Sequence, residues 1–118
     1  MAKILICDDA MFMRQTLKRI LDTTDHQVVA EAGGGLECIE KCKLFTPDII
    51  LMDITMDDMD GIEATKQIKA FDSNVKIIMV SAMGQQEKVF QAISSGALDF
   101  IVKPFQPETV IACIQKYV

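Results

Sequence analysis

Five short apolar runs, rich in β-branched residues, alternate along the chain with five segments of helical periodicity. The runs cover residues 3–7, 27–32, 48–52, 75–80 and 98–102. Each is about as long as an ordinary strand, and three are almost continuously apolar, which is typical of strands covered on both faces. Because parallel strands need crossover connections, the alternation predicts an α/β fold with a doubly wound, five-stranded parallel sheet. The pattern alone leaves the order of the strands open.

The segments that follow the runs repeat apolar residues every three or four positions, which predicts helices with one buried face. We expect a core position for the residues of these stripes: Met13, Leu17, Ile20, Leu21, Leu36, Ile39, Cys42 or Lys43, Ile62, Thr65, Ile68, Phe71, Val89, Ala92, Ile93, Ala97, Val110, Ile111, Ile114 and Val118. Gly96 follows the fourth stripe, where a left-handed helix C-cap favours glycine. With no linker or repeat, the chain is expected to form one domain over residues 1–118.

The chain is acidic, with a formal net charge of -5 and no basic run. Since binding to nucleic acid or to an anionic membrane surface rests largely on Lys and Arg, neither is an expected partner. The apolar run near the N-terminus is too short for a signal peptide, and no stretch approaches the ~18 apolar residues of a spanning helix. We therefore expect a cytoplasmic protein.

The four cysteines do not form a metal-binding pattern. They are Cys7, Cys38, Cys42 and Cys113, and no two of them are spaced C-x-x-C. Cys38 and Cys42 are spaced to share a helix face, but they supply only two ligands, and the single histidine, His26, is remote in sequence. We interpret the four thiols as small buried hydrophobic groups.

Polar residues of complementary chemistry follow four of the five expected strands. Asp8 and Asp9 follow the first run, Asp53 the third, Ser81 the fourth and Lys103 the fifth. In open parallel sheets, ligands bind beyond the carboxyl ends of the strands, where the strand order reverses. Three carboxylates, a hydroxyl and an ammonium group are therefore expected to converge on one edge of the sheet.

This set of groups suits phosphoryl transfer. Clustered carboxylates repel one another, and Mg²⁺, or Mn²⁺ in its place, is a hard cation that takes oxygen ligands. A carboxylate is also a nucleophile toward phosphorus, and a cation, a lysine and a hydroxyl would balance the charge of the transferred group. Each residue also has an ordinary structural explanation. Asp8, Asp9 and Ser81 would cap helices, Asp53 would lie in a turn, and Lys103 would be a solvated charge.

The segments ILICDDAMFMR, PDIILMDITMDDMDGIEA, KIIMVSAMG and GALDFIVKPF resemble the successive motifs of the response regulator receiver domain family. The resemblance covers essentially the whole chain, and VSAMGQQEKVFQAISSGALDFIVKPFQP is most similar to the chemotaxis members of the family. It implies a flavodoxin-like three-layer αβα sandwich with strand order 2-1-3-4-5.

The resemblance also implies a role for each strand-end carboxylate. Asp53 matches the phosphoacceptor of the family. Asp9 matches the residue that binds Mg²⁺ directly, and Asp8 matches the residue that acts mainly through water. The backbone carbonyl of Thr55 would be a further metal ligand.

Three more positions match the groups that respond to the phosphoryl group. Ser81 matches the switch hydroxyl and Lys103 the lysine that pairs with the phosphoryl group, with a cis bond to Pro104. Phe100 matches the aromatic switch residue, which is often Tyr in relatives.

The chain also departs from the family pattern in the loops beside the site. Asp57 stands where the family usually has Pro, which makes the loop unusually acidic and puts its rigidity and metal affinity in question. Met83 stands where a polar group sometimes orients water.

We interpret the chain as a monomeric response regulator of a two-component phosphorelay, and not as an enzyme, although it would assist its own phosphorylation and dephosphorylation. The implied partners are a histidine kinase, the flagellar motor switch protein and a phosphatase. The alternative is a receiver domain cut from a longer transcription factor or methylesterase. An aspartate-dependent phosphatase would need a second Asp two residues after the first, and the chain has Ala10 and Thr55 at the corresponding positions.

Overall fold

All five apolar runs are strands and all five periodic segments are helices in the computed structural model, which describes residues 1–118. The strands are β1 (Lys3–Cys7), β2 (Gln27–Ala32), β3 (Ile49–Asp53), β4 (Lys76–Ala82) and β5 (Asp99–Lys103). The helices are α1 (Met11–Asp22), α2 (Gly35–Phe45), α3 (Gly61–Phe71), α4 (Gln86–Ser94) and α5 (Pro107–Gln115).

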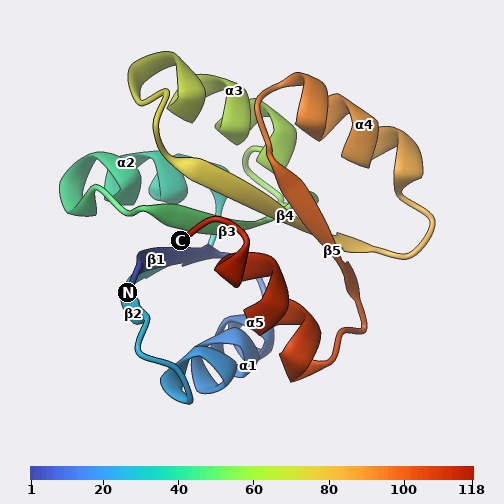
Figure 1. The fold of residues 1–118 in the computed structure, drawn as a ribbon. Helices are drawn as coiled ribbons and strands as arrows, with labels where there is room; N and C mark the ends of the chain where they lie inside the picture. Colours follow the sequence, from blue (N-terminus) through green and yellow to red (C-terminus); the bar gives the residue numbers. More distant parts are fainter.

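The five strands form one parallel sheet in the order β2-β1-β3-β4-β5, which confirms the order that the family resemblance implied. Helices α2, α3 and α4 cover one face of the sheet, and α1 and α5 cover the other (Figure 1). The chain passes from β1 to β2 on one side and later returns to place β3 on the other side. The strand order therefore reverses between β1 and β3, where ligands of such sheets bind.

The hydrophobic core consists of one layer on each side of the sheet. Along β1, Leu5 and Cys7 belong to the layer beneath α2, α3 and α4, whereas Ile4 and Ile6 belong to the layer beneath α1 and α5. Successive side chains of a strand point to opposite faces. Both faces of the central strands are thus buried, which explains why these runs are almost continuously apolar.

Most residues of the expected helix stripes are buried or half-buried, but four large ones are exposed. The expectation of a core position is wrong for Leu36, Phe71, Ile93 and Val118. In α2 the buried side chains are Cys38 and Cys42, which turns Leu36 outward. Periodicity identifies a helix, but it does not choose between two apolar faces when both have helical spacing.

Several local expectations are confirmed. Gly96 has φ +119 and follows α4, and the Lys103–Pro104 peptide bond is cis. All four cysteines are buried and free. None of the helices is both long and apolar enough to cross a membrane.

The strand ends differ from the sequence expectation by one or two residues. The apolar runs predict that β4 ends at residue 80 and β5 at residue 102, but both strands continue because Ser81 pairs with Val102 and Ala82 with Lys103. Asp53 is likewise the last residue of β3. These three polar side chains are therefore fixed by the sheet itself and do not lie in loops.

Candidate functional site

Three carboxylates gather at the carboxyl edge of the two central strands. Asp8 and Asp9 directly follow β1, and Asp53 ends the neighbouring strand β3. One carboxylate oxygen from each residue lies within 4.8 Å of the others. Asp8 and Asp53 are only 2% and 8% exposed, whereas Asp9 faces the solvent. The structure thus brings together the three carboxylates that the sequence predicted.

Lys103 joins this cluster from β5. Its Nζ lies 3.1 Å from Oδ2 of Asp8 and 3.3 Å from Oδ1 of Asp53. β4 separates β3 from β5, so the long lysine side chain crosses a strand to reach the two carboxylates. The ordinary explanation of Lys103 as a solvated charge is therefore wrong. One ammonium group does not balance three carboxylates, so the cluster keeps an excess of negative charge.

The electrostatics of the cluster disfavour the ionised form of Asp53. Burial, and next the charge of Asp8, raise the pKa of Asp53 from its ordinary value of 3.8 to about 6, although Lys103 opposes the shift. Desolvation lowers the pKa of Lys103, but the charges of Asp53 and Asp8 outweigh it and raise that pKa overall. A cation bound beside these carboxylates would relieve the same repulsion.

The donor set of the cluster fits Mg²⁺, since all three side chains offer carboxylate oxygens. The two aspartates after β1 are not equivalent. Asp8 uses Oδ1 to accept a hydrogen bond from the backbone N–H of Ala10 at 2.9 Å and Oδ2 to bind Lys103. Asp9 forms neither contact, so its oxygens remain available to a metal ion. Neither aspartate caps α1, because the N-cap residue is Ala10 and no side chain caps that helix.

Ser81 supplies a buried hydroxyl near the end of β4. The residue is 1% exposed, and its Oγ has no hydrogen-bond partner. It does not cap α4, whose N-cap residue is Gln85. A buried polar group without a partner is costly and uncommon. A ligand oxygen near Ser81 would provide the missing partner.

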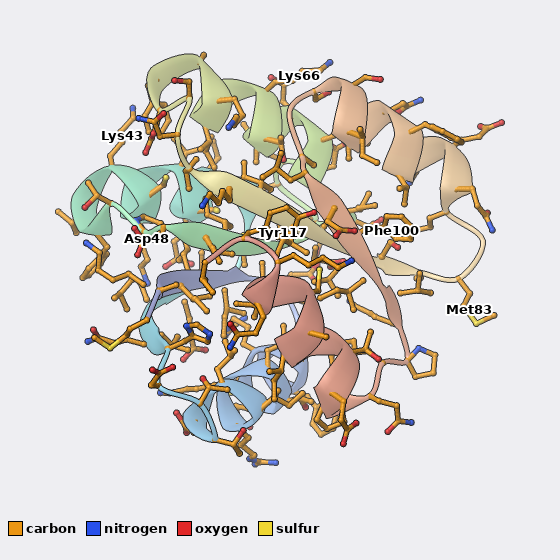
Figure 2. The ribbon with its side chains drawn as sticks, viewed as in Figure 1. Lys43, Asp48, Lys66, Met83, Phe100 and Tyr117 are labelled. Atoms are coloured by element: carbon orange, nitrogen blue, oxygen red, sulfur yellow. The ribbon has the colours of Figure 1, made fainter.

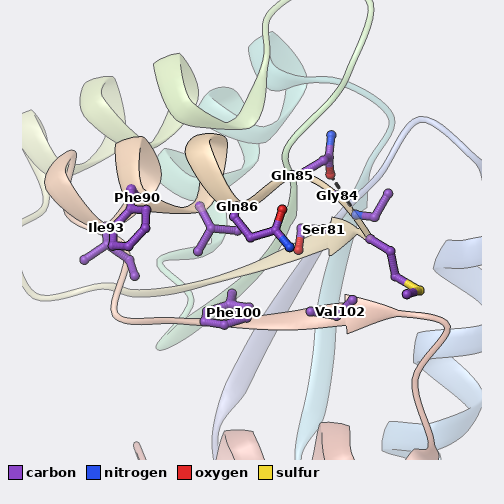
Figure 3. Close-up of a pocket in the computed structure, with 11 residues that line it drawn as sticks. Ser81, Gly84, Gln85, Gln86, Phe90, Ile93, Phe100 and Val102 are labelled. Atoms are coloured by element: carbon purple, nitrogen blue, oxygen red, sulfur yellow. Dashed lines mark hydrogen bonds between the residues drawn. The ribbon is translucent and has the colours of Figure 1, made fainter.

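A groove of about 460 Å³ separates α4 from β5 (Figure 3). Its lining is mostly apolar, with Phe90 and Ile93 from α4 and Val102 from β5. Ser81 and Phe100 both line it, from neighbouring strands. Phe100 is 42% exposed, so its ring is not packed in the core in this structure. The groove therefore connects the unpartnered hydroxyl with the aromatic residue that the family resemblance singled out.

Gln85 is a polar residue of the site region that sequence reasoning missed. Its Nε2 donates to Oγ1 of Thr55 at 3.0 Å, and its Oε1 accepts from the backbone N–H of Ala82 at 2.7 Å. Met83, by contrast, is exposed and projects from the edge of the molecule (Figure 2). Sequence carries no signal for the first contact, because Thr55 and Gln85 lie in different loops.

The acidic loop between β3 and α3 serves mainly as a set of helix caps. Asp58 accepts hydrogen bonds from the backbone N–H groups of Gly35 at 3.0 Å and Leu36 at 3.2 Å, at the start of α2. Asp60 is the N-cap residue of α3 and accepts from the N–H of Glu63 at 2.8 Å. Asp57 is exposed and forms no hydrogen bond with its side chain. Two of the three acidic side chains thus stabilise helix starts.

His26 lies apart from the carboxylate cluster. Its Nδ1 accepts a hydrogen bond from the backbone N–H of Ala2, which precedes β1, whereas Asp8 and Asp9 follow β1. The ring is buried and has no carboxylate or serine partner. It takes no part in a Ser-His-Asp arrangement.

Comparison with known proteins gives matches over nearly the whole chain. A family model described as the response regulator receiver domain matches residues 4–115. The chain is 54% identical over 116 residues to the chemotaxis protein CheY of Listeria monocytogenes, and the alignment covers 98% of both proteins.

Solved structures agree with the sequence matches. The response regulator domain of Thermotoga maritima CheB matches with a TM-score of 0.88 and 35% identity, over 98% of this chain and 94% of that one. A chain of the CheX–CheY–BeF3–Mg complex from Borrelia burgdorferi matches with a TM-score of 0.92 and 34% identity, over 97% of this chain and 87% of that one.

Proposed function

Because the chain belongs to the response regulator receiver domain family, we propose that it is a chemotaxis signalling switch that accepts a phosphoryl group on Asp53. Receiver domains take this group from a histidine kinase, bind Mg²⁺ at an acidic pocket and act as signalling modules. The observation that carries the residue assignment is the contact of Lys103 with two buried carboxylates, 3.1 Å from Asp8 and 3.3 Å from Asp53.

In the proposed reaction, an oxygen of Asp53 attacks the phosphorus of a phosphohistidine on the kinase. The O–P bond forms as the P–N bond breaks, and the electron pair of that bond stays on the imidazole nitrogen. Lys103 provides a positive charge beside the phosphoryl oxygens, and the unpartnered hydroxyl of Ser81 donates a hydrogen bond to one of them. Water later hydrolyses the acyl phosphate in the same pocket.

The proposed Mg²⁺ ligands are Asp9, Asp53 and the backbone carbonyl of Thr55, with Asp8 acting through water. Mn²⁺ would bind in the same way. The bound ion supplies positive charge against the carboxylates and the phosphoryl oxygens. In support, the oxygens of Asp9 are free of other contacts and those of Asp8 are engaged.

The proposed output is a change of the surface formed by α4, β5 and α5. Ser81 moves toward the phosphoryl group, and the ring of Phe100 turns into the groove that both residues line. A small hydroxyl shift is thereby coupled to a two-state packing change on the surface. The partner that reads this surface is the flagellar motor switch protein, and a phosphatase ends the signal.

Chemotaxis is favoured over transcriptional control by the 54% identity to a CheY protein that the chain matches over 98% of its length. The alternative is the receiver part of a longer regulator. The methylesterase version of this alternative is supported by the similarity to the CheB response regulator domain. We propose that the chain acts as a monomer in the cytoplasm.

The experiment that tests the function is phosphorylation by acetyl phosphate, followed by intact mass. Wild type should gain one phosphoryl group with Mg²⁺ and none with a chelator, and Asp53→Asn should gain none. Asp57→Asn is the matched control, because Asp57 is an exposed aspartate in the next loop, and it should be modified like wild type. Full modification of Asp53→Asn would show that the acceptor is another residue.

A further inference from the structure

We infer that Gln85 is a positioning residue that holds the metal-binding loop in place, an inference that rests on the proposed function. Its side-chain amide joins two loops of the site edge. The Nε2 donates to Oγ1 of Thr55 in the loop after β3, and the Oε1 accepts from the N–H of Ala82 at the end of β4. The two distances are 3.0 and 2.7 Å.

The geometry leaves one orientation for the amide of Gln85. The backbone N–H of Ala82 needs an acceptor, so the carbonyl oxygen must face it, and the NH₂ group must then face Thr55. Gly84, with φ +86, turns the chain just before Gln85 and has no atom within 4 Å of its missing Cβ position. Gln85 is also the N-cap residue of α4, but its side chain does not cap that helix. Its amide atoms instead form the two hydrogen bonds to Thr55 and Ala82, which together bridge the two loops.

The hydrogen bonds of Gln85 connect the loop that carries Thr55 with the end of β4, and the proposed function gives a role to a residue in each of these two segments. Thr55 carries the carbonyl that is proposed to bind Mg²⁺, and Ala82 directly follows Ser81 in β4. The Thr55 side chain is exposed and forms no other hydrogen bond. Without the amide of Gln85, the loop carrying Thr55 would lose its side-chain link to the ordered end of the sheet. A neutral amide provides this link without adding charge to the acidic cluster.

The expected consequence is a specific loss of Mg²⁺ affinity. The net free energy of a neutral hydrogen bond corresponds to a change in affinity on the order of fivefold. Gln85→Met keeps a side chain of similar length and removes both hydrogen bonds. Thr55→Val removes the hydroxyl that accepts one of them and keeps the backbone carbonyl. Both variants should bind Mg²⁺ on the order of fivefold more weakly than wild type.

The test is calorimetric titration of Mg²⁺ into wild type, both single variants and the double variant, with Gln86→Met as the matched control. Gln86 is the exposed neighbour in α4 and has no side-chain hydrogen bond. If the bridge operates as inferred, the double variant binds no more weakly than either single variant, and Gln86→Met binds like wild type. With acetyl phosphate, the Mg²⁺ concentration for half-maximal phosphorylation rises in Gln85→Met while the rate at saturating Mg²⁺ stays near wild type.

Two results would overturn the inference while leaving the proposed function intact. Gln85→Met could bind Mg²⁺ as tightly as wild type, or the losses of Gln85→Met and Thr55→Val could simply add. A wild-type protein that binds no Mg²⁺ would instead overturn the proposed metal site and the inference together. Melting curves of all variants separate these outcomes from loss of folding.

Discussion

At the level of single residues, the carboxylates of Asp8 and Asp53 repel each other, and their burial further disfavours the ionised form of Asp53. Asp53 and Asp8 are buried side by side, and Lys103 is the only cation that contacts their carboxylates. As a consequence, the pKa of Asp53 is raised from 3.8 to about 6. Between these two pH values the folded protein keeps a proton on Asp53 that the unfolded chain has lost. Removing the charge of Asp53 should therefore stabilise the protein, and by an amount that depends on pH.

We expect Asp53→Asn to be more stable than wild type at neutral pH in the presence of a chelator. Between about pH 4 and about pH 6, folded wild type binds more protons than the unfolded chain, so its free energy of unfolding falls as the pH rises. Below that window Asp53 is neutral in both states, and the advantage of the variant should vanish.

Urea unfolding of both proteins across this pH range measures the effect. Mg²⁺ added at neutral pH should narrow the difference, because the ion stabilises ionised Asp53. A difference in stability that stays constant from about pH 4 to neutral pH would show that the repulsion is not its cause.

The hydroxyl of Ser81 lacks a partner in the unphosphorylated protein, and this has a separate consequence. Ser81→Ala removes a buried polar atom that makes no hydrogen bond, so the free energy of unfolding should rise by about 1 kcal/mol. Ser73→Ala, at an exposed turn residue, should stay within about 0.5 kcal/mol of wild type. Denaturant unfolding of wild type and both variants measures these free energies. A lower free energy of unfolding in Ser81→Ala would mean that the hydroxyl of Ser81 has a hydrogen-bond partner.

At the scale of elements, the loop between β3 and α3 holds the start of α2. The first N–H groups of a helix have no partner within the helix. The carboxylate of Asp58, which lies in a different loop, accepts hydrogen bonds from two of these N–H groups in α2. The N-cap residue Gly34 has no side chain that could do so. A Cβ at Gly34 would lie 2.6 Å from Oδ1 of Asp58. The glycine is therefore required by this close approach and not by its backbone angles, since its φ of -170 is ordinary extended backbone.

We predict that Asp58→Ala lowers the Tm by about 5 °C, the usual effect of losing a helix cap in a domain of this size. Asp57→Ala changes a neighbouring carboxylate without hydrogen bonds and should leave the Tm unchanged. Gly34→Ala should also lower the Tm, but less so when Asp58→Ala is already present, because the clash is then absent. Equal effects of Gly34→Ala in both backgrounds would contradict the close approach.

At the scale of the whole molecule, the sheet order decides which distant segments meet. Residue 8 directly follows β1, and residues 53, 81 and 103 lie at the ends of β3, β4 and β5. The order β2-β1-β3-β4-β5 brings these four strand ends to one edge. The same order places β5 beside β4, so that Phe100 and Ser81 share the groove under α4. Phosphorylation of Asp53 could therefore act on the surface of β5 through Ser81 and the neighbouring ring of Phe100.

If phosphorylation acts through Ser81 on Phe100, it should bury the ring of Phe100, which is 42% exposed in the unphosphorylated protein. The measurement is ¹⁹F NMR of protein labelled with fluorophenylalanine, with the resonance of Phe100 assigned by its loss in Phe100→Leu. Addition of beryllofluoride and Mg²⁺ should shift this resonance in wild type but not in Asp53→Asn.

Phe45 provides the internal control, because it is an exposed phenylalanine at the C-terminal end of α2, which leads back to the start of β3 and away from the carboxylates. Its resonance should remain where it is. A Phe100 resonance that does not respond to beryllofluoride would mean that Phe100 is a static surface residue and that the output uses another element.

The strands, the helices and the polar groups at the strand ends can be derived from the sequence. Each of these follows from local rules: apolar periodicity selects the backbone conformation, and the carboxyl ends of parallel strands share one edge. The same rules group Asp8, Asp9, Asp53 and Lys103 from the sequence alone. Periodicity left the strand order open, and only the resemblance to a known family supplied it.

Which partners these groups have depends on the tertiary structure. The contacts of Gln85 with Thr55 and of Asp58 with Gly35, the first residue of α2, join residues that are 30 and 23 positions apart in the chain. The outward turn of Leu36 and the missing partner of Ser81 were equally invisible in the sequence. Such contacts depend on how loops and helix faces pack after the sheet has formed, and a local pattern contains no information about a neighbour that only the folded chain supplies.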